Sequence, residues 1–159
     1  HQGIALLKLL NHNQYTSSNA SVHSGTIGEH IRHNIDHYIC FLSGINATHI
    51  NYDDRKRDSK IETDPSYAIR LMEDICERLT SINPQTFDTA IDVKVASNAD
   101  KQDRTSKSSI GRELQFLVSH TIHHYAIIAL LCRIEGIQPE EDFGVAPSTI
   151  NYRHQLQGA

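Results

Sequence analysis

The side chains that could carry chemistry in this chain are its histidines. The sequence holds eleven of them in 159 residues, and histidine both titrates near neutral pH and is the commonest metal ligand. Two pairs have the spacing HxxxH, His33 with His37 and His120 with His124. Side chains four residues apart on a helix project from one face on successive turns, so each pair could bind a single ion.

His120 and His124 lie in the most apolar stretch of the chain, on the same helical arc as its large aliphatic side chains. His123 falls nearer the polar edge of that helix, which favours a supporting or surface position. An unpaired buried polar group costs about 1–3 kcal/mol. Two imidazoles on an apolar face therefore need hydrogen-bond partners or a metal ion.

A second group, His30, His33 and His37, shares one face of another predicted helix, well apart from the aliphatic stripe of that helix. If this face turns toward His120 and His124, one of the three completes a three-histidine site with an open position for water or substrate. Spacing does not select which one. The alternative is a set of hydrogen-bonded core or surface histidines, because a chain so rich in histidine yields HxxxH pairs by chance.

Four helices must position these side chains, and their ends carry recognisable residues. Thr26 followed by Glu29 is a capping box, Asp64-Pro65 places a cap residue before a proline at the first helical position, and Ser108-Ser109 precedes the longest apolar segment. The predicted helices span about 2–11, 27–43, 64–79 and 110–135.

The helical pattern predicts an all-α fold, an antiparallel four-helix bundle with long polar connections at 45–63 and 98–107. Ile91, Val93 and Val95 alternate with polar neighbours, which permits a short strand, but one strand cannot form a sheet. The length fits a single domain over 1–159, with a C-terminal tail from about 137.

Composition narrows the function classes. A net charge of −4 argues against nucleic acid as a partner, and no apolar run approaches the roughly 18 residues of a membrane span. Cys40, Cys76 and Cys132 are far apart, which argues against a disulfide framework or a thiolate zinc site and fits a reducing cytoplasm. The first residues show no secretory signal. A homodimer is compatible with a bundle of this size.

With these residues in view, the chain resembles the DinB/YfiT superfamily of four-helix-bundle metal-binding proteins over nearly its whole length. Two segments carry the resemblance, Thr26-Ile27-Gly28-Glu29-His30-Ile31-Arg32-His33 and Ser119-His120-Thr121-Ile122-His123-His124-Tyr125. The first resembles the helix start of the family, with the ligand histidine seven residues after a small polar residue. The second resembles the HxxxH on its last bundle helix.

This resemblance implies a divalent ion, zinc or nickel most often, bound by His33, His120 and His124 with water filling the remaining positions. His37 and His30 flank His33 and remain alternative ligands. Some family members are thiol-dependent S-transferases or related hydrolases, so the implied partner is a small-molecule substrate, such as a thiol. The resemblance names no particular substrate.

Two further segments resemble a bacterial subgroup of the same superfamily, which places this chain among bacterial proteins. One is a Tyr-Asp-x-Arg-x-Arg-Asp loop, here the segment 52–58, and the other is a Phe-Gly-Val-Ala-Pro-Ser-Thr tail, here 143–149. No reaction follows from this subgroup.

Four other residues are candidates for catalysis. Arg55 and Arg57 could present guanidinium forks to a carboxylate or phosphate of a substrate, or could belong to a solvated charged loop. Glu113 lies seven residues before His120, too far to share its ion, and could act as a base or as an arginine partner. Asp36 could orient the imidazole of His33 or face solvent.

The sequence thus predicts a metal-dependent enzyme of the S-transferase or hydrolase type with a three-histidine site. The alternative is a non-catalytic metal-binding, structural or interaction module. In the module, a fourth protein ligand is expected to complete the coordination of the metal. In the enzyme, one coordination position of the metal is expected to hold an exchangeable water or substrate.

Overall fold

The structure is a computed structural model, and it describes residues 1–18, 25–96 and 105–157. Most of the predicted polar connection at 98–107 lies outside these residues. The described α-helices are α1 (Gln2–Leu9), α2 (His12–Thr16), α3 (Ile27–Gly44), α4 (Ser59–Thr63), α5 (Pro65–Thr80), α6 (Ile110–Ile134) and α7 (Pro147–Gln157). The described strands are β1 (His49–Asn51), β2 (Ala90–Lys94) and β3 (Thr105–Ser109).

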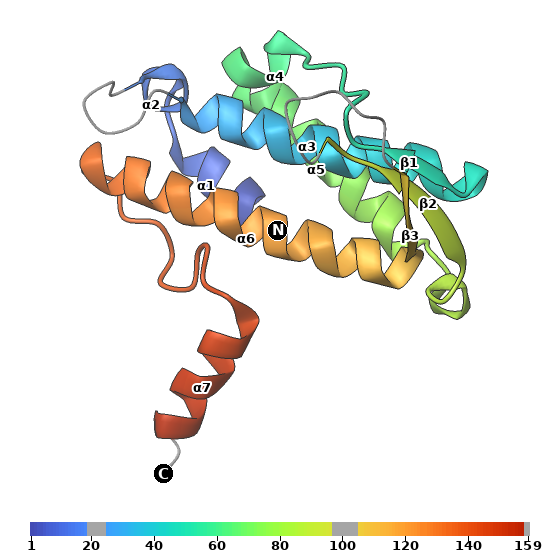
Figure 1. Cartoon of the computed structure of the whole chain (residues 1–159). Helices are drawn as coiled ribbons and strands as arrows, with labels where there is room; N and C mark the ends of the chain where they lie inside the picture. The colour runs from blue at the N-terminus through green and yellow to red at the C-terminus, as the bar shows by residue number, and fades with distance from the viewer. Residues whose placement is uncertain (19–24, 97–104, 158–159) are drawn as a thin grey trace.

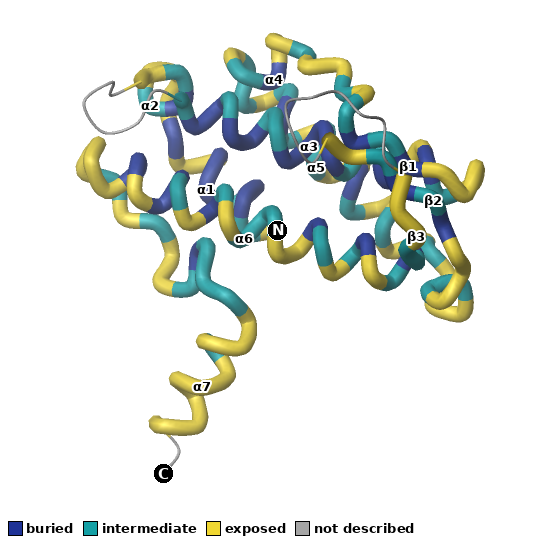
Figure 2. Tube along the Cα trace, in the orientation of Figure 1, coloured by how far each residue is buried: buried dark blue, intermediate teal, exposed yellow. Residues whose placement is uncertain are grey.

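The two long helices α3 and α6 run side by side in opposite directions, with α5 packed against α3 and α1 against α5 (Figure 1). The predicted helices correspond to α1, α3, α5 and α6. Figure 2 shows that their buried residues gather where these helices face one another. Apolar burial between these helices supplies the main stabilisation of the elements that carry the histidines.

The predicted helix starts are confirmed by their capping hydrogen bonds. Thr26 Oγ1 accepts from the Glu29 backbone N–H at 3.0 Å, and Glu29 Oε2 accepts from the Thr26 N–H at 2.6 Å, which completes the capping box of α3. Asp64 accepts from the Tyr67 N–H at 2.9 Å at the start of α5. These bonds satisfy N–H groups that have no partner within the helix.

The prediction of an all-α four-helix bundle is wrong, because the protein also contains a three-stranded sheet in the order β1-β2-β3. β1 pairs with β2 in parallel, with Ile50 opposite Val93. β2 pairs with β3 in antiparallel fashion, with Ile91 opposite Ser108. The fold is therefore mixed α/β, with the sheet at the end of the molecule where α3 finishes and α6 begins (Figure 1).

Two of the three strands lack an apolar alternation that a sequence pattern could detect. β1 is three residues long and lies within the segment predicted as a polar connection. β3 reads Thr-Ser-Lys-Ser-Ser, with its first three residues exposed. Among these strands, β2 alternates two buried apolar side chains, Ile91 and Val93, with polar neighbours, whereas β1 buries Ile50 alone. The sheet depends on pairing between segments distant in sequence, which local pattern does not report.

The predicted tail from about 137 contains ordered structure. Phe143 is buried and its ring stacks on that of Tyr125, with centroids 4.6 Å apart. Gly144 has a φ of 73° and lies against the backbone of Tyr125 and Ala126, where a side chain would not fit. Beyond this anchor, α7 extends away from the body of the molecule, and its residues are mostly exposed (Figure 2).

Gly28 brings α3 against α4, and its replacement by alanine is expected to destabilise the protein. A methyl group at position 28 would overlap the backbone carbonyl oxygen of Glu62. Relief requires a backbone shift, and overpacking of this kind costs about 1–3 kcal/mol. Urea unfolding of Gly28→Ala measures the loss, with the exposed Ser43→Ala on the same helix as a control. Equal stability of both variants would contradict the close approach.

Candidate metal centre

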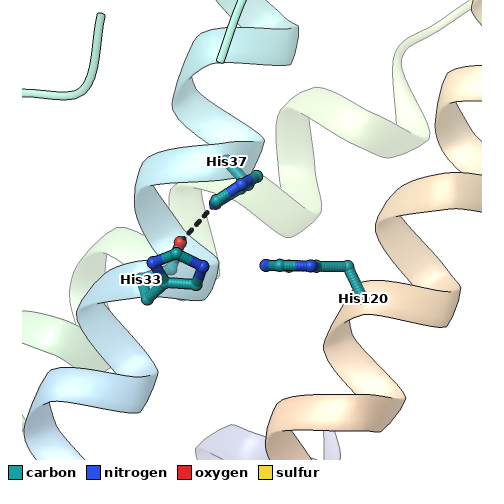
Figure 3. A group of neighbouring side chains, drawn as sticks. All are labelled: His33, His37 and His120. Atoms are coloured by element: carbon teal, nitrogen blue, oxygen red, sulfur yellow. Dashed lines mark hydrogen bonds between the residues drawn. The ribbon is translucent and has the colours of Figure 1, made fainter. Parts of the chain in front are cut away.

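Three histidines from two helices meet between α3 and α6. His33 and His37 come from α3 and His120 comes from α6, and one ring nitrogen of each lies within 4.8 Å of the others (Figure 3). The ring centroids are 4.5 Å apart for His33 and His37, 5.0 Å for His33 and His120, and 4.2 Å for His37 and His120. We call these three residues the histidine cluster. Three imidazoles at these separations could converge on one ion after small side-chain rotations.

The hydrogen bonds within the cluster leave ring nitrogens available. His37 Nδ1 donates to the backbone carbonyl oxygen of His33 at 2.8 Å (Figure 3). This bond places the ring proton on Nδ1 and the lone pair on Nε2, as in many metal-binding histidines. His120 Nε2 is buried and has no hydrogen-bond partner within the described part of the chain. A buried nitrogen of this kind fits a metal ligand.

His124 lies beside the cluster. Its ring centroid is 4.6 Å from those of both His33 and His120. Its Nδ1, however, lies 2.8 Å from Nδ1 of His30, at hydrogen-bond distance. The structure thus brings together the five histidines that were candidate ligands from the sequence, His30, His33, His37, His120 and His124. The ring nitrogens that lie within 4.8 Å of one another belong to the triad His33/His37/His120. The triad implied by the sequence resemblance, His33/His120/His124, shares His33 and His120 with it and stays a prediction.

The cluster is neutral at physiological pH. The pKa of His33 and that of His124 are each lowered to about 3. Burial is the largest cause, and the neighbouring histidines are the next. The same causes lower the pKa of His120 to about 4. Burial also lowers the pKa of His37, against the opposing effect of its hydrogen bond to the His33 carbonyl. Neutral imidazoles carry the lone pairs that metal binding requires.

These low pKa values predict acid sensitivity of the metal-free protein. An unfolded histidine titrates near about 6.5, so between that pH and about 3 the unfolded chain binds more protons than the folded one. Stability is then complete above about pH 6.5 and falls as the pH is lowered. The groups facing these rings are His30, His37, His123 and Arg55. Urea unfolding in EDTA at pH 7, 5.5 and 4.5 measures the decline, and a flat profile would contradict it.

Glu113 is buried and belongs to a network at the sheet end of the site. Its Oε2 accepts from the Tyr52 hydroxyl at 2.9 Å and its Oε1 accepts from the Ser108 hydroxyl at 2.6 Å. The Tyr52 ring in turn stacks on His37, with centroids 5.4 Å apart. Glu113 therefore braces the cluster through Tyr52. Its carboxylate accepts hydrogen bonds from two hydroxyl groups. The sequence had suggested either a catalytic base or a partner for an arginine.

The other candidate residues occupy different surroundings. Asp36 is buried and pairs with Arg32 at 3.1 Å. Arg55 is half-buried and donates from Nη1 to the Tyr52 carbonyl oxygen at 2.6 Å. Burial and the neighbouring histidines are the main causes of the low pKa of His33 and of His120, and the positive charge of Arg55 is a smaller cause. Arg55 therefore lies near the cluster. Arg57 is exposed, with a φ of 51°.

The three cysteines are free, and none of them belongs to the histidine cluster. Cys132 is buried, and burial raises the pKa of its thiol to about 11. Burial also raises the pKa of Cys40, which is half-buried on α3. Neither thiol is poised to ionise near neutral pH, which agrees with structural roles.

Comparison with known proteins gives one relative. FK506-binding protein 5 of Rhizopus delemar is 33% identical to this chain over 107 residues. The matched region covers 67% of this chain but 28% of the relative, so the chain spans under a third of the length of that protein. No family model matches the chain. No solved structure matches it either. The resemblance to the DinB/YfiT superfamily therefore stays a prediction.

Two of the expectations from the sequence are corrected by these findings. The relative comes from a fungus, so the placement of the chain among bacterial proteins is not supported. The expectation that no apolar run approaches the length of a membrane span is wrong, because α6 is long and apolar enough to cross a membrane by length and composition alone. The core helix of a soluble protein meets the same criterion, and α6 here packs against α3 and carries His120.

Proposed function

We propose that this chain is a metal-dependent enzyme of the thiol S-transferase or hydrolase type, with a divalent transition metal, zinc or nickel, at the histidine cluster. The observation that carries the proposal is the convergence of His33, His37 and His120 with ring nitrogens within 4.8 Å. The buried, unpartnered His120 Nε2 supports it within the described residues. Imidazole ligands suit both metals.

A bound ion would supply an electrophile that lowers the pKa of a coordinated water or thiol. The chain itself holds neutral imidazoles in place and keeps their surroundings partly dry. His37 is oriented by its bond to the His33 carbonyl, and Tyr52 covers its ring. Three protein ligands would leave a position for the substrate.

Arg55 supports a small anionic substrate or a substrate with an anionic group. Its guanidinium is held by the Tyr52 carbonyl, and its Nε is buried without a hydrogen-bond partner among the described residues. A carboxylate or phosphate beside the cluster would accept from that guanidinium and offset its charge. In this proposal Arg55 binds substrate, while Arg57 has no part in the site.

Cobalt substitution tests the proposal directly. The metal-free protein is loaded with Co²⁺, and its visible absorption is recorded while 2-mercaptoethanol is added. We expect stoichiometric cobalt binding and a saturable spectral change as thiolate enters the open position. His123→Ala, at an exposed neighbouring histidine, should behave like wild type. Absence of stoichiometric binding would contradict the metal site.

A spectrum that does not respond to thiol would instead favour a closed, structural site. That outcome corresponds to the alternative function, a non-catalytic metal-binding or interaction module. His124 is the residue that could close the shell, because its ring lies 4.6 Å from those of His33 and His120. Its contact with His30 favours the open site.

For cellular context we propose a cytoplasmic enzyme acting on a small molecule, without nucleic acid or a membrane as partner. Free cysteines and a net charge of −4 support this. The fungal relative is named as a protein that binds FK506. Because most of that protein lies outside the match, its activity is not carried over to this chain.

A further inference from the structure

A cavity of about 430 Å³ lies among α3, α5 and α6, on a side of α3 and α6 away from the histidine cluster. Its volume falls within the range of small-molecule sites, about 300–1,000 Å³. Ile31, Ile35 and Ile75 give it an apolar wall, and residues around Pro147 complete it from the C-terminal segment. None of the three cluster histidines lines it.

Asn34 is the polar side chain that this cavity leaves without a partner. It lies on α3, is 5% exposed, and lines the cavity. Its Oδ1 and its Nδ2 are both buried without a hydrogen-bond partner among the described residues. By contrast, Tyr38 and Thr121 in the same wall bond each other at 3.0 Å. Leaving a buried amide unpaired is costly, so Asn34 points to a ligand that pairs with it.

We propose that this cavity binds an uncharged apolar molecule bearing a carboxamide, with the amide paired reciprocally to Asn34. The side-chain amide would donate from Nδ2 to the ligand carbonyl and accept at Oδ1 from the ligand N–H. The described lining contains no aspartate, glutamate, lysine or arginine, and its histidine, His1, is an exposed residue rather than one buried beside Asn34. An ionised ligand group held at Asn34 would therefore be buried without a fixed counter-charge. The site is distinct from the proposed metal centre.

Binding of decanamide tests this site, with methyl nonanoate as the matched ligand. The two molecules have equal numbers of heavy atoms, but the ester has no N–H to donate to Asn34 Oδ1. Titrations are made in EDTA and followed by calorimetry and by the NMR signals of the Asn34 side-chain amide. We expect saturable binding of decanamide with an affinity about tenfold higher than that of the ester. This factor is the size expected when the ester complex lacks one buried hydrogen bond and leaves Asn34 Oδ1 unpaired.

The variant Asn34→Leu keeps the side-chain volume similar and removes the amide. It should bind methyl nonanoate at least as tightly as wild type, which shows that the cavity is intact, and it should lose the preference for decanamide. Asn13→Leu, at an exposed asparagine in α2, should leave both affinities unchanged. Failure of wild type to bind decanamide, or an amide preference that persists in Asn34→Leu, would overturn the proposal.

Discussion

Replacing His33 or His120 by alanine is expected to lower the affinity for zinc by at least about 100-fold. Removing a group that merely orients a ligand already costs about 10–100-fold in metal affinity. His33 and His120 belong both to the histidine cluster and to the triad implied by the sequence resemblance. Competition with a chelator of known zinc affinity measures the loss. Retained far-ultraviolet circular dichroism would show that the helices remain folded.

The same titration on His37→Ala and His124→Ala decides between the triads. If His37 is the third ligand, its loss should approach that of His120, while His124→Ala should change affinity much less. The reverse order would favour the triad implied by the sequence resemblance. His123→Ala is the matched control, since it is an exposed histidine on the same turn of α6. Unchanged zinc affinity in His33→Ala and His120→Ala would exclude both triads.

Replacing Glu113 by alanine is expected to destabilise the protein by about 2–4 kcal/mol, because the Tyr52 and Ser108 hydroxyls would lose their acceptor. The change should also weaken zinc binding by about 10–100-fold, since Tyr52 packs on His37 and would no longer be held. Urea unfolding and chelator competition measure the two effects.

Tyr52→Phe separates the contributions within this network. It removes one hydroxyl and keeps the ring stacked on His37, so we expect a smaller loss of stability than in Glu113→Ala and nearly normal zinc affinity. Glu73→Ala, at an exposed glutamate on α5, should change neither property. Glu113→Ala with wild-type stability would show that the two hydroxyls do not depend on this carboxylate.

The helical part of the fold could be predicted because its determinants are local. Thr26 with Glu29, and Asp64 with Pro65, mark helix starts through contacts within one turn, and the spacing of Ile27, Ile31 and Ile35 marks a buried face. The sheet could not be predicted in this way. Ser108 and Lys107 carry no apolar pattern, and they become strand residues only by pairing with Ile91 and Asp92.

The candidate site likewise has a part that local pattern predicts and a part that it does not. Periodicity places His30, His33 and His37 on one face of α3, and His120 and His124 on one face of α6. Which of them approach one another depends on the offset between the helices, which no local pattern contains. The contact of His30 with His124, and the proximity of His37 to His120, follow from that offset. The role of Glu113 likewise depends on Ser108 in β3 and on Tyr52, which directly follows β1, and neither position could be placed without the sheet.

The direct passage from β3 into α6 has a consequence for how the protein opens. Ser109 is the last residue of β3 and also caps α6, accepting from the Arg112 N–H at 3.3 Å. Without an intervening loop, the start of α6 cannot fray unless the β2 and β3 ladder separates. Amide hydrogens of Val93 and of the first turns of α6 should therefore exchange with deuterium as one cooperative unit. His120 lies on the same helix, so separation of this ladder would also loosen the element that carries a residue of the histidine cluster.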